Sequence, residues 1–197
     1  MNISYVKQGT PEWFEVRAGK PTASNFDKII TTQGEPSKQK TKYLYKLAGE
    51  AVSGITDESY KSEAMARGNE LEDEARSFYQ LVNDCKVHQI GFCFSDIGAG
   101  FSPDGLVEDK GLLEIKCPLS STHIEYLLNG KLPSTYYQQV QGALFITGRE
   151  WLDFISYYPG IKPFIIRVTP DEDFQQALER ELKSFINELN IIITKIS

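Results

Sequence analysis

The chain has 197 residues and a net charge of −6, with 41% hydrophobic, 12% aromatic and 24% charged residues. These are ordinary values for a globular protein, and they exclude a disordered chain, a collagen-like chain and a coiled-coil rod. A chain of this length buries a sizeable core, and we expect a single domain over residues 1–197. The overall acidity does not indicate a nucleic-acid partner, so any such role must depend on a local patch.

Cysteine content and the hydrophobic profile bear on the cellular compartment. The three cysteines, Cys85, Cys93 and Cys117, are too few and too scattered to form a disulfide framework. The N-terminus shows no basic segment followed by an apolar run, and no apolar stretch is long enough to span a membrane. We therefore expect a soluble protein that works in a reducing cytoplasm.

The N-terminal third of the chain has the pattern of helices. A short helix starts at Pro11 with Thr10 as its N-cap, and a second helix starts at Thr22 and runs to Ile30. Apolar residues spaced three and four apart predict two longer helices, over residues 40–52 and 63–81.

The pattern then changes to short apolar runs interrupted by glycine, which are typical of strands. The predicted strands cover residues 91–94, 101–107 and 112–116, with a turn at 108–111 between the last two. Helices are predicted at 120–128 and 135–145, a strand hairpin at 151–158 and 164–168, and a last amphipathic helix at 171–193. This order predicts a mixed α/β fold with helices on both faces of a central sheet. The glycine motifs of P-loop and dinucleotide-binding folds are absent.

The most informative stretch is Ser102-Pro103-Asp104-Gly105, followed after Asp104 by nine residues and then Glu114-Ile115-Lys116. Because side chains alternate along a strand, Glu114 and Lys116 point to one face while Ile115 points to the other, into core. The turn at 108–111 folds the preceding strand back, which brings Asp104 beside Glu114. Two carboxylates and one lysine are then expected to meet at one point.

Two neighbouring carboxylates repel each other, and a divalent cation relieves that repulsion. Ligation by oxygen alone favours Mg²⁺ or Mn²⁺, which polarises phosphate oxygens and lowers the pKa of a bound water. The lysine orients or deprotonates that water, or neutralises charge that develops on the phosphate. The spacing therefore favours metal-assisted hydrolysis of a phosphodiester. The alternative is a solvated hairpin that carries an exposed Glu–Lys pair.

These residues resemble the signature of the PD-(D/E)XK nuclease superfamily. More closely, the chain is similar to the lambda exonuclease (YqaJ-like viral recombinase) family, and the resemblance covers most of its length. The motifs that carry it occur in the family's order: Glu12-Trp13 with Arg17, Thr22-Ala23-Ser24, Gly68-Asn69-Glu70-Leu71-Glu72, Ser102-Pro103-Asp104-Gly105, Glu114-Ile115-Lys116-Cys117-Pro118 and Gln139-Val140-Gln141. The resemblance implies a restriction-endonuclease-like fold, with a mixed central β-sheet flanked by helices.

The resemblance also implies the roles of the catalytic residues. Asp104 and Glu114 would hold the metal together with the backbone carbonyl of Ile115, and Lys116 would be the catalytic lysine. Glu72 would complete the acidic cluster, either directly or through water. Three other acids on the same predicted helix compete with Glu72 in the sequence and are interpreted as an ordinary solvated face: Glu70, Asp73 and Glu74.

In this family a second set of residues forms a pocket for a terminal 5′-phosphate, and here the matching residues are Arg17, Ser24, Ser102 and Gln139. A guanidinium offers a planar fork to a phosphate, while hydroxyls and an amide add hydrogen-bond donors. Two other glutamines of the same predicted helix are alternatives to Gln139: Gln138 and Gln141.

The activity implied is that of a Mg²⁺-dependent, processive 5′→3′ exonuclease on double-stranded DNA ends, with Mn²⁺ as a substitute metal. Such an enzyme resects the 5′-phosphorylated strand and leaves a 3′ single strand for recombination by strand annealing. The resemblance further implies a ring-shaped homotrimer, a phage single-strand annealing protein as partner, and the cytoplasm of a bacterial host. The alternatives are an endonuclease of the same fold, for restriction or junction resolution, and a non-catalytic module that binds DNA ends.

Overall fold

The structure, a computed structural model, describes the backbone of residues 1–56 and 63–197 and the side chains of residues 1–56 and 70–197. Its described strands form two sheets. The smaller sheet has the order β1-β3-β4, with β1 at Asn2–Ser4, β3 at Phe92–Phe94 and β4 at Gly100–Phe101. The larger sheet has the order β2-β5-β6-β7-β8 and consists of Val87–His88, Gly105–Val107, Gly111–Lys116, Trp151–Ser156 and Phe164–Val168.

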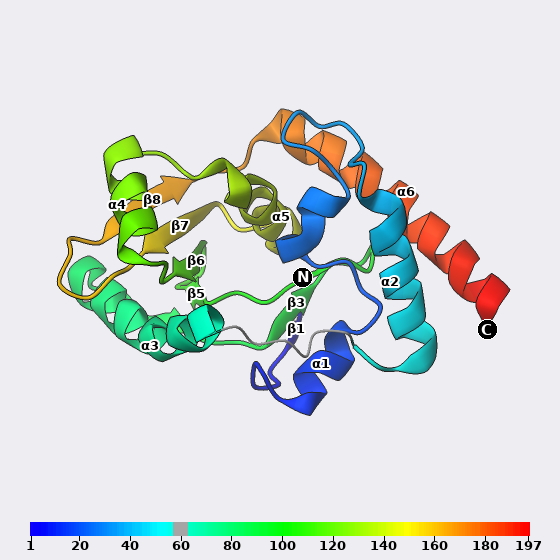
Figure 1. The fold of residues 1–197 in the computed structure, drawn as a ribbon, viewed down its shortest axis with the longest axis horizontal. Coiled ribbons are helices and arrows are strands. Elements are labelled where there is room, and N and C mark those ends of the chain that lie inside the picture. Colours follow the sequence, from blue (N-terminus) through cyan, green and yellow to red (C-terminus); the bar gives the residue numbers. More distant parts are fainter. Residues whose placement is uncertain (57–62) are drawn as a thin grey trace.

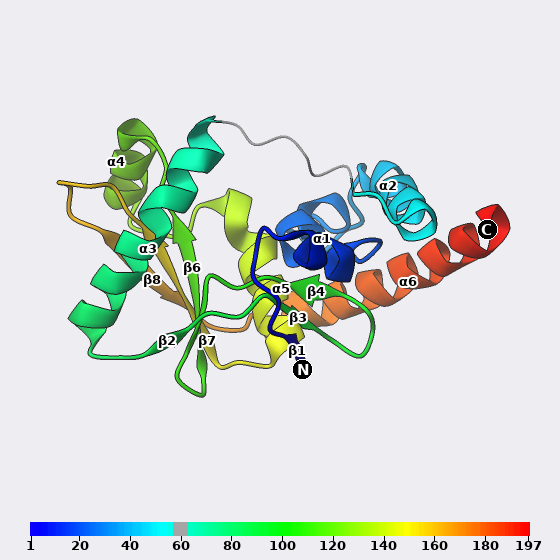
Figure 2. The ribbon, with the colours of Figure 1, turned by 90° about the horizontal axis from the view of Figure 1, so that it is seen from below.

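The larger sheet is mixed, because β6 and β7 run parallel while the other neighbours are antiparallel. The α-helices are α1 (Pro11–Arg17), α2 (Lys40–Ser53), α3 (Glu63–Asn83), α4 (Ser120–Asn129), α5 (Tyr137–Thr147) and α6 (Glu172–Ile196). Two short 3₁₀ helices are η1 (Ala23–Lys28) and η2 (Ser134–Tyr136). The α3 and α4 helices flank the larger sheet, whereas α2 and the long α6 lie together at the other end of the molecule (Figures 1 and 2).

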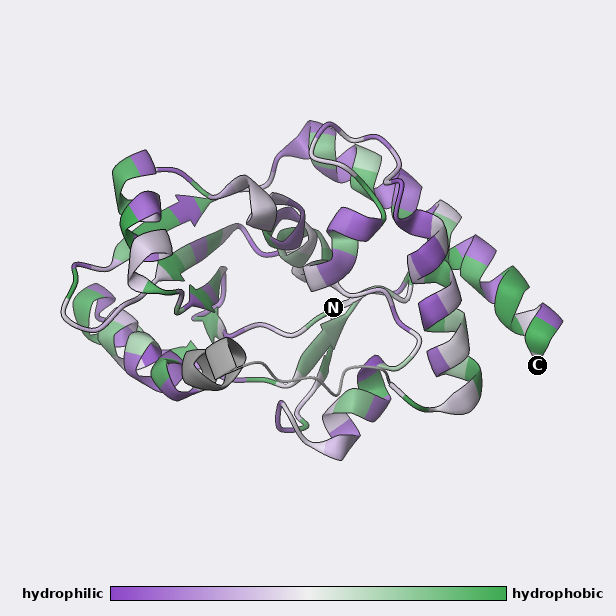
Figure 3. Cartoon of the chain, viewed as in Figure 1, coloured by the Kyte–Doolittle hydropathy of each residue, from purple (hydrophilic) through white to green (hydrophobic). Residues whose placement is uncertain are grey.

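Both faces of the larger sheet are covered. On one face Leu113 and Ile115 pack with Tyr79 of α3. On the other face Leu112 and Phe154 join the main core, to which α5, α2 and α6 contribute. Hydrophobic residues accordingly run along the strands, while the helices alternate hydrophobic and hydrophilic residues (Figure 3). The mixed α/β fold with helices around a mixed sheet is confirmed, and the face that carries Glu114 and Lys116 is also part of the core.

The predicted strand over residues 101–107 is wrong in one respect, because two strands in different sheets take its place. Pro103 lies in the segment between β4 and β5, and its ring nitrogen has no hydrogen to donate to a strand ladder. The chain crosses there from the small sheet to the large one. At the first residue of β5 only glycine fits, since a Cβ on Gly105 would lie 2.1 Å from Cγ1 of Val87. Asp104 therefore sits at the crossing point.

Two helix predictions also need correction. The segment after Thr22 forms the short 3₁₀ helix η1 instead of an α-helix, and the segment predicted to start at Thr135 begins with η2 before α5 continues it. Near the end of α3 the side chain of Val82 is exposed, whereas that of Tyr79 is buried.

The remaining elements agree with the sequence patterns. Asp171 caps α6, since its carboxylate accepts a hydrogen bond from the backbone N–H of Phe174. Gly54 ends α2 in the left-handed conformation, with a φ of 69°. All three cysteines are free thiols. Within residues 1–56 and 63–197, none of the helices combines the length and apolar character that crossing a membrane requires.

Candidate active site

The β5–β6 hairpin brings the first two predicted acids together. Gly105 pairs with Leu113 across the hairpin, so the residue before Gly105 lies opposite Glu114. The carboxylate of Asp104 accepts a hydrogen bond of 2.6 Å from the backbone N–H of Ile115. The family resemblance assigns the backbone carbonyl of Ile115 to the metal. The backbone N–H of the same residue holds Asp104.

Glu114 is the most deeply buried acid of the site, with only 2% of its surface exposed. Its Oε1 accepts hydrogen bonds of 2.6 Å from the side-chain amide of Gln139 and from Nζ of Lys116. Its Oε2 is buried and has no hydrogen-bond partner among the described residues. The alternative of a solvated Glu–Lys hairpin is therefore excluded by burial.

A buried carboxylate oxygen without a partner is costly, and such a group is ordinarily satisfied by a donor or a metal ion. Oxygen ligands are those that a hard divalent cation prefers, so this donor set fits such a cation. Among the described residues, no group of three or more His, Cys, Asp or Glu side chains converges into a ready-made metal cluster. The set is accordingly two carboxylates, Asp104 and Glu114, with the neighbouring backbone carbonyl.

Helix α3 directs one of its four neighbouring acids toward this centre. Glu72 is half-buried, and its carboxylate accepts a hydrogen bond from the buried guanidinium of Arg76. The other three acids are exposed: Glu70, Asp73 and Glu74. Glu72 is thus the one acid of these four whose side chain is not exposed.

Burial and neighbouring charges shift the pKa values of the side chains at this centre. Burial raises the pKa of Asp104 well above its usual value, and the carboxylates of Glu114 and Glu72 raise it further. Burial also raises the pKa of Glu72, although Arg76 opposes that shift. For Lys116, burial lowers the pKa, but attraction by Glu114 and Asp104 outweighs burial and the net direction is upward. The lysine is therefore held as a cation.

A second group of polar side chains lies where α1 meets the segment before Asp104. The guanidinium of Arg17 donates a hydrogen bond of 2.9 Å to the hydroxyl oxygen of Ser102. The indole N–H of Trp13 donates to the same oxygen at 3.0 Å, and the Arg17 guanidinium lies 4.1 Å from the centre of the Trp13 ring. The structure thus joins Arg17 and Ser102, and it gives Trp13 a supporting place that sequence reasoning missed.

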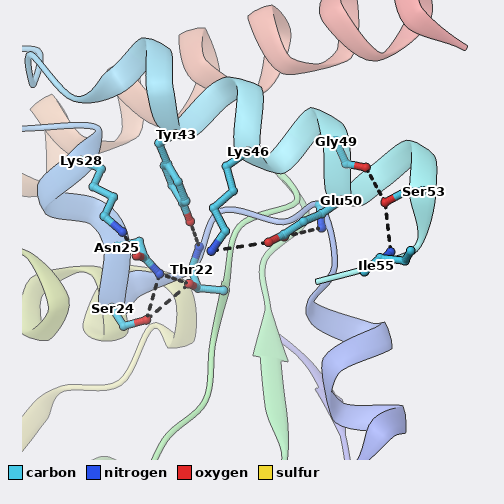
Figure 4. Close-up of polar contacts among 11 residues, drawn as sticks. Thr22, Ser24, Asn25, Lys28, Tyr43, Lys46, Gly49, Glu50, Ser53 and Ile55 are labelled. Atoms are coloured by element: carbon cyan, nitrogen blue, oxygen red, sulfur yellow. Dashed lines mark hydrogen bonds and ion pairs between the residues drawn. The ribbon is translucent and has the colours of Figure 1, made fainter. Parts of the chain in front are cut away.

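Ser24 belongs to a neighbouring network on η1, which Figure 4 shows. Its exposed hydroxyl lies 3.3 Å from Oγ1 of Thr22 and 3.4 Å from the amide nitrogen of Asn25. Thr22 and Asn25 line the same small cavity as Arg17, together with Lys20 and Lys46. Ser24 is therefore linked to the Arg17 region through its neighbours and not by a direct contact that the structure records.

The three candidate glutamines of α5 differ in burial and in their hydrogen-bond partners. Gln139 is half-buried and reaches Glu114, as described above. Gln138 and Gln141 are buried, and their amides donate to the backbone carbonyls of Ile30 and Thr169. Only Gln139 faces the acidic centre, where it contacts a carboxylate.

Arg76 was not assigned a role by sequence reasoning, although it bonds Glu72 and the backbone carbonyl of Asp104. The signal was its place four residues after Glu72, one helical turn away, on a helix whose stripe is otherwise apolar. An arginine on a buried stripe needs acceptors, and here the acceptors are site residues.

Comparisons with known proteins give both a family match and similar solved structures. The family model described as the YqaJ-like viral recombinase domain matches residues 12–150. The chain is 35% identical to an alkaline exonuclease (LHK-Exo) of Laribacter hongkongensis, with a TM-score of 0.86 over 95% of this chain and 96% of that one. The same figures hold for the structure of LHK-Exo in complex with dAMP.

A more distant structure is a phage-related exonuclease of Haemophilus somnus, with 14% identity, a TM-score of 0.70, and coverage of 90% of this chain and 96% of that one. At that identity the likeness shows the fold alone. No curated protein matches the chain. The family match and the 35% identity over nearly the whole length lead to one conclusion. The chain belongs to the YqaJ-like viral recombinase family, which is the lambda exonuclease family, and it is a nuclease that acts on DNA.

Proposed function

We propose that this nuclease is a Mg²⁺-dependent, processive 5′→3′ exonuclease on double-stranded DNA ends, which Mn²⁺ also supports. The observation that carries the proposal is the buried, unpartnered Oε2 of Glu114, beside Asp104 and Lys116. Asp104, Glu114 and the Ile115 carbonyl would hold the metal, and Glu72 would assist directly or through water. When bound there, a divalent cation polarises a phosphate oxygen and favours ionisation of water.

The chain's own residues supply the remaining chemistry. Lys116, kept protonated by its two carboxylate neighbours, donates to the attacking water or to phosphate oxygens as negative charge develops on them. Its ammonium lies 5.2 Å from the ring centre of Tyr136, and this contact limits where the side chain can turn. Gln139 holds Glu114 in place through one oxygen and leaves the other oxygen for the cation.

The polarity of digestion follows from the second group of residues. Arg17 and Ser102 lie next to each other, and Ser102 is two residues before Asp104 in the chain. A terminal 5′-phosphate held by Arg17, Ser24, Ser102 and Gln139 would place the first phosphodiester near the acidic centre. Each cut then leaves a new 5′-phosphate, which becomes the handle for the next cut and supports processivity. The structure of LHK-Exo with dAMP, a mononucleotide, is consistent with cutting from an end.

The proposal also covers the oligomeric state of the enzyme, its partner protein and its cellular compartment. We infer a homotrimeric ring around DNA, a phage single-strand annealing protein as partner, and action in the cytoplasm of a bacterial host. The family likeness supports these inferences. Exposed apolar side chains offer surface for subunit contacts, among them Leu128 of α4 and Ile191 and Ile196 on the hydrophobic, projecting end of α6 (Figure 3).

The test compares three DNA substrates of one sequence: a linear duplex with 5′-phosphates, the same duplex with 5′-hydroxyls, and the supercoiled circle. We expect fast release of mononucleotides from the first, slower release from the second and no cutting of the third. An enzyme that cuts circles as well as ends would be an endonuclease. Lys116→Ala should abolish cleavage and keep end binding, whereas binding without any cleavage by the native protein would indicate a non-catalytic module.

A further inference from the structure

The guanidinium of Arg76 links Glu72 to the backbone of Asp104, although Arg76 is not among the residues assigned to metal or DNA. Arg76 projects from the middle of α3 and is 5% exposed. A guanidinium has five N–H donors in a rigid fork, and a buried one is costly unless they are satisfied.

The acceptors around Arg76 come from three different elements. From its own helix, the carboxylates of Glu72 and Asp73 accept from its two terminal nitrogens. From the segment before β5, the backbone carbonyl of Asp104 accepts from Nε at 3.1 Å. From the segment after β2, the side-chain oxygen of Gln89 accepts from both terminal nitrogens, at 2.9 and 3.0 Å, in the orientation of the amide that satisfies both residues.

Two of these acceptors hold the guanidinium in place, and the guanidinium in turn orients a third acceptor, the carboxylate of Glu72. The Asp104 carbonyl and Gln89 fix the fork against the sheet edge, so the nitrogen that contacts Glu72 has a set position. Glu72 Oε1 accepts from Arg76, so the position of the Arg76 fork sets how the Glu72 carboxylate is turned. We propose that Arg76 is a positioning residue that orients the Glu72 carboxylate toward a divalent cation held by Asp104 and Glu114. This inference rests on the proposed function.

The charge balance supports this role. Arg76 pairs with the carboxylates of Glu72 and Asp73, whereas Lys116 pairs with that of Glu114. Arg76 thus adds a second cation beside that of Lys116, and it offsets the negative charge of Glu72. A lysine at this position would keep the charge but not the fork, since an ammonium has three donors and cannot hold Glu72, Gln89 and Asp104 in one plane.

The test measures Mn²⁺ binding directly by isothermal titration calorimetry, on Arg76→Gln and Arg76→Lys. We expect both variants to bind Mn²⁺ about 10- to 100-fold more weakly, the range found when groups that orient metal ligands are removed. The KM for 5′-phosphorylated duplex should change little, while kcat at fixed Mg²⁺ should fall. If Arg76→Gln does not fold by circular dichroism, Arg76→Lys carries the test alone. Arg180→Gln is the matched control, because Arg180 is an exposed arginine on α6 and its loss should change neither quantity.

A double-mutant cycle separates positioning from general damage. In a Glu72→Gln background, the Arg76 substitution should weaken Mn²⁺ binding by less than about threefold, because the group it orients is already altered. An undiminished loss in that background would overturn the inference, as would Arg76 variants that bind Mn²⁺ as tightly as the native protein. Failure of the native protein itself to bind Mn²⁺ would instead overturn the proposed function, and the inference with it.

Discussion

Two buried carboxylates on neighbouring strands differ in how fully their oxygens are hydrogen-bonded. Glu114 on β6 and Asp153 on β7 are 2% and 3% exposed, and the two strands pair in parallel. Asp153 accepts bonds of 2.8 and 2.9 Å from the guanidinium of Arg167 and one of 2.6 Å from the hydroxyl of Tyr79. Glu114 has partners on one oxygen only.

The difference follows from the register of the two strands. Asp153 pairs with Leu113, so its side chain points to the face that α3 covers, whereas Glu114 points to the face that α5 covers. On the α3 face every oxygen of the acid is used, and the arrangement stabilises the fold. On the α5 face one oxygen is left over. Burial alone therefore does not distinguish the two acids, whereas the unsatisfied oxygen of Glu114 does.

The largest effect is expected from Glu114→Gln, which removes the charge but keeps the shape. Loss of a metal ligand should lower cleavage by about 10³-fold or more, equivalent to roughly 4 kcal/mol of barrier. Saturating Mn²⁺ should stabilise the native protein, by about 2.7 kcal/mol at 100 times its Kd, but not the variant. A variant with near-native cleavage would contradict the comparison.

Asp153→Asn is the matched substitution on the other strand, and it should affect stability instead of activity. The free energy of unfolding should fall by about 2 kcal/mol, the usual range for hydrogen bonds to a charged group. Because Arg167 is 54% exposed, water compensates part of its lost charge partner. Chemical denaturation measures this loss. Mn²⁺ affinity and cleavage at 25 °C should stay near native, and a tenfold loss of either would assign Asp153 to the site.

Ser102→Ala tests whether a hydroxyl that already has hydrogen-bond partners in the protein also binds the terminal phosphate. The Ser102 oxygen already accepts from Trp13 and Arg17, so burial and pairing alone would suggest a structural role. If it holds the terminal phosphate, its loss should reduce the preference for 5′-phosphate over 5′-hydroxyl ends by about tenfold, or 1.4 kcal/mol. Ser184→Ala, on the surface of α6, is the control. An unchanged preference would remove Ser102 from the proposed pocket.

The smallest effect is expected from Tyr79→Phe, which removes one of the three bonds to Asp153. The cost should be about 1 kcal/mol of unfolding free energy, or a drop of about 2–4 °C in the melting temperature. Tyr45→Phe, at an exposed tyrosine of α2, should cost nothing measurable. Cleavage should be native in both variants, and reduced cleavage in Tyr79→Phe would mean that Tyr79 and Asp153 contribute to the chemistry.

The sequence predicted much of this arrangement, because local patterns carry it. The alternation around Ile115 and the turn at 108–111 were enough to place Asp104 beside Glu114. The apolar spacing of α6, from Phe174 to Leu189, predicted a stripe that is buried throughout. These features depend on neighbours in the chain.

Other features depend on contacts between distant segments, which a single sequence does not record. The break of the 101–107 strand reflects the crossing between two sheets. The bond between Gln139 and Glu114, and the convergence of Glu72, Asp104 and Gln89 on Arg76, join residues from separate elements. The same holds for Asp153, whose sequence context gives no sign that Tyr79 and Arg167 will satisfy it.

The most direct test of the central claim is the anomalous scattering of Mn²⁺ in crystals of the native protein. We predict a peak in contact with the carboxylates of both Asp104 and Glu114, with Glu114 Oε2 about 2.0–2.2 Å from the ion. A structure with no ion at these two side chains, or with the two carboxylates turned apart into solvent, would contradict the account.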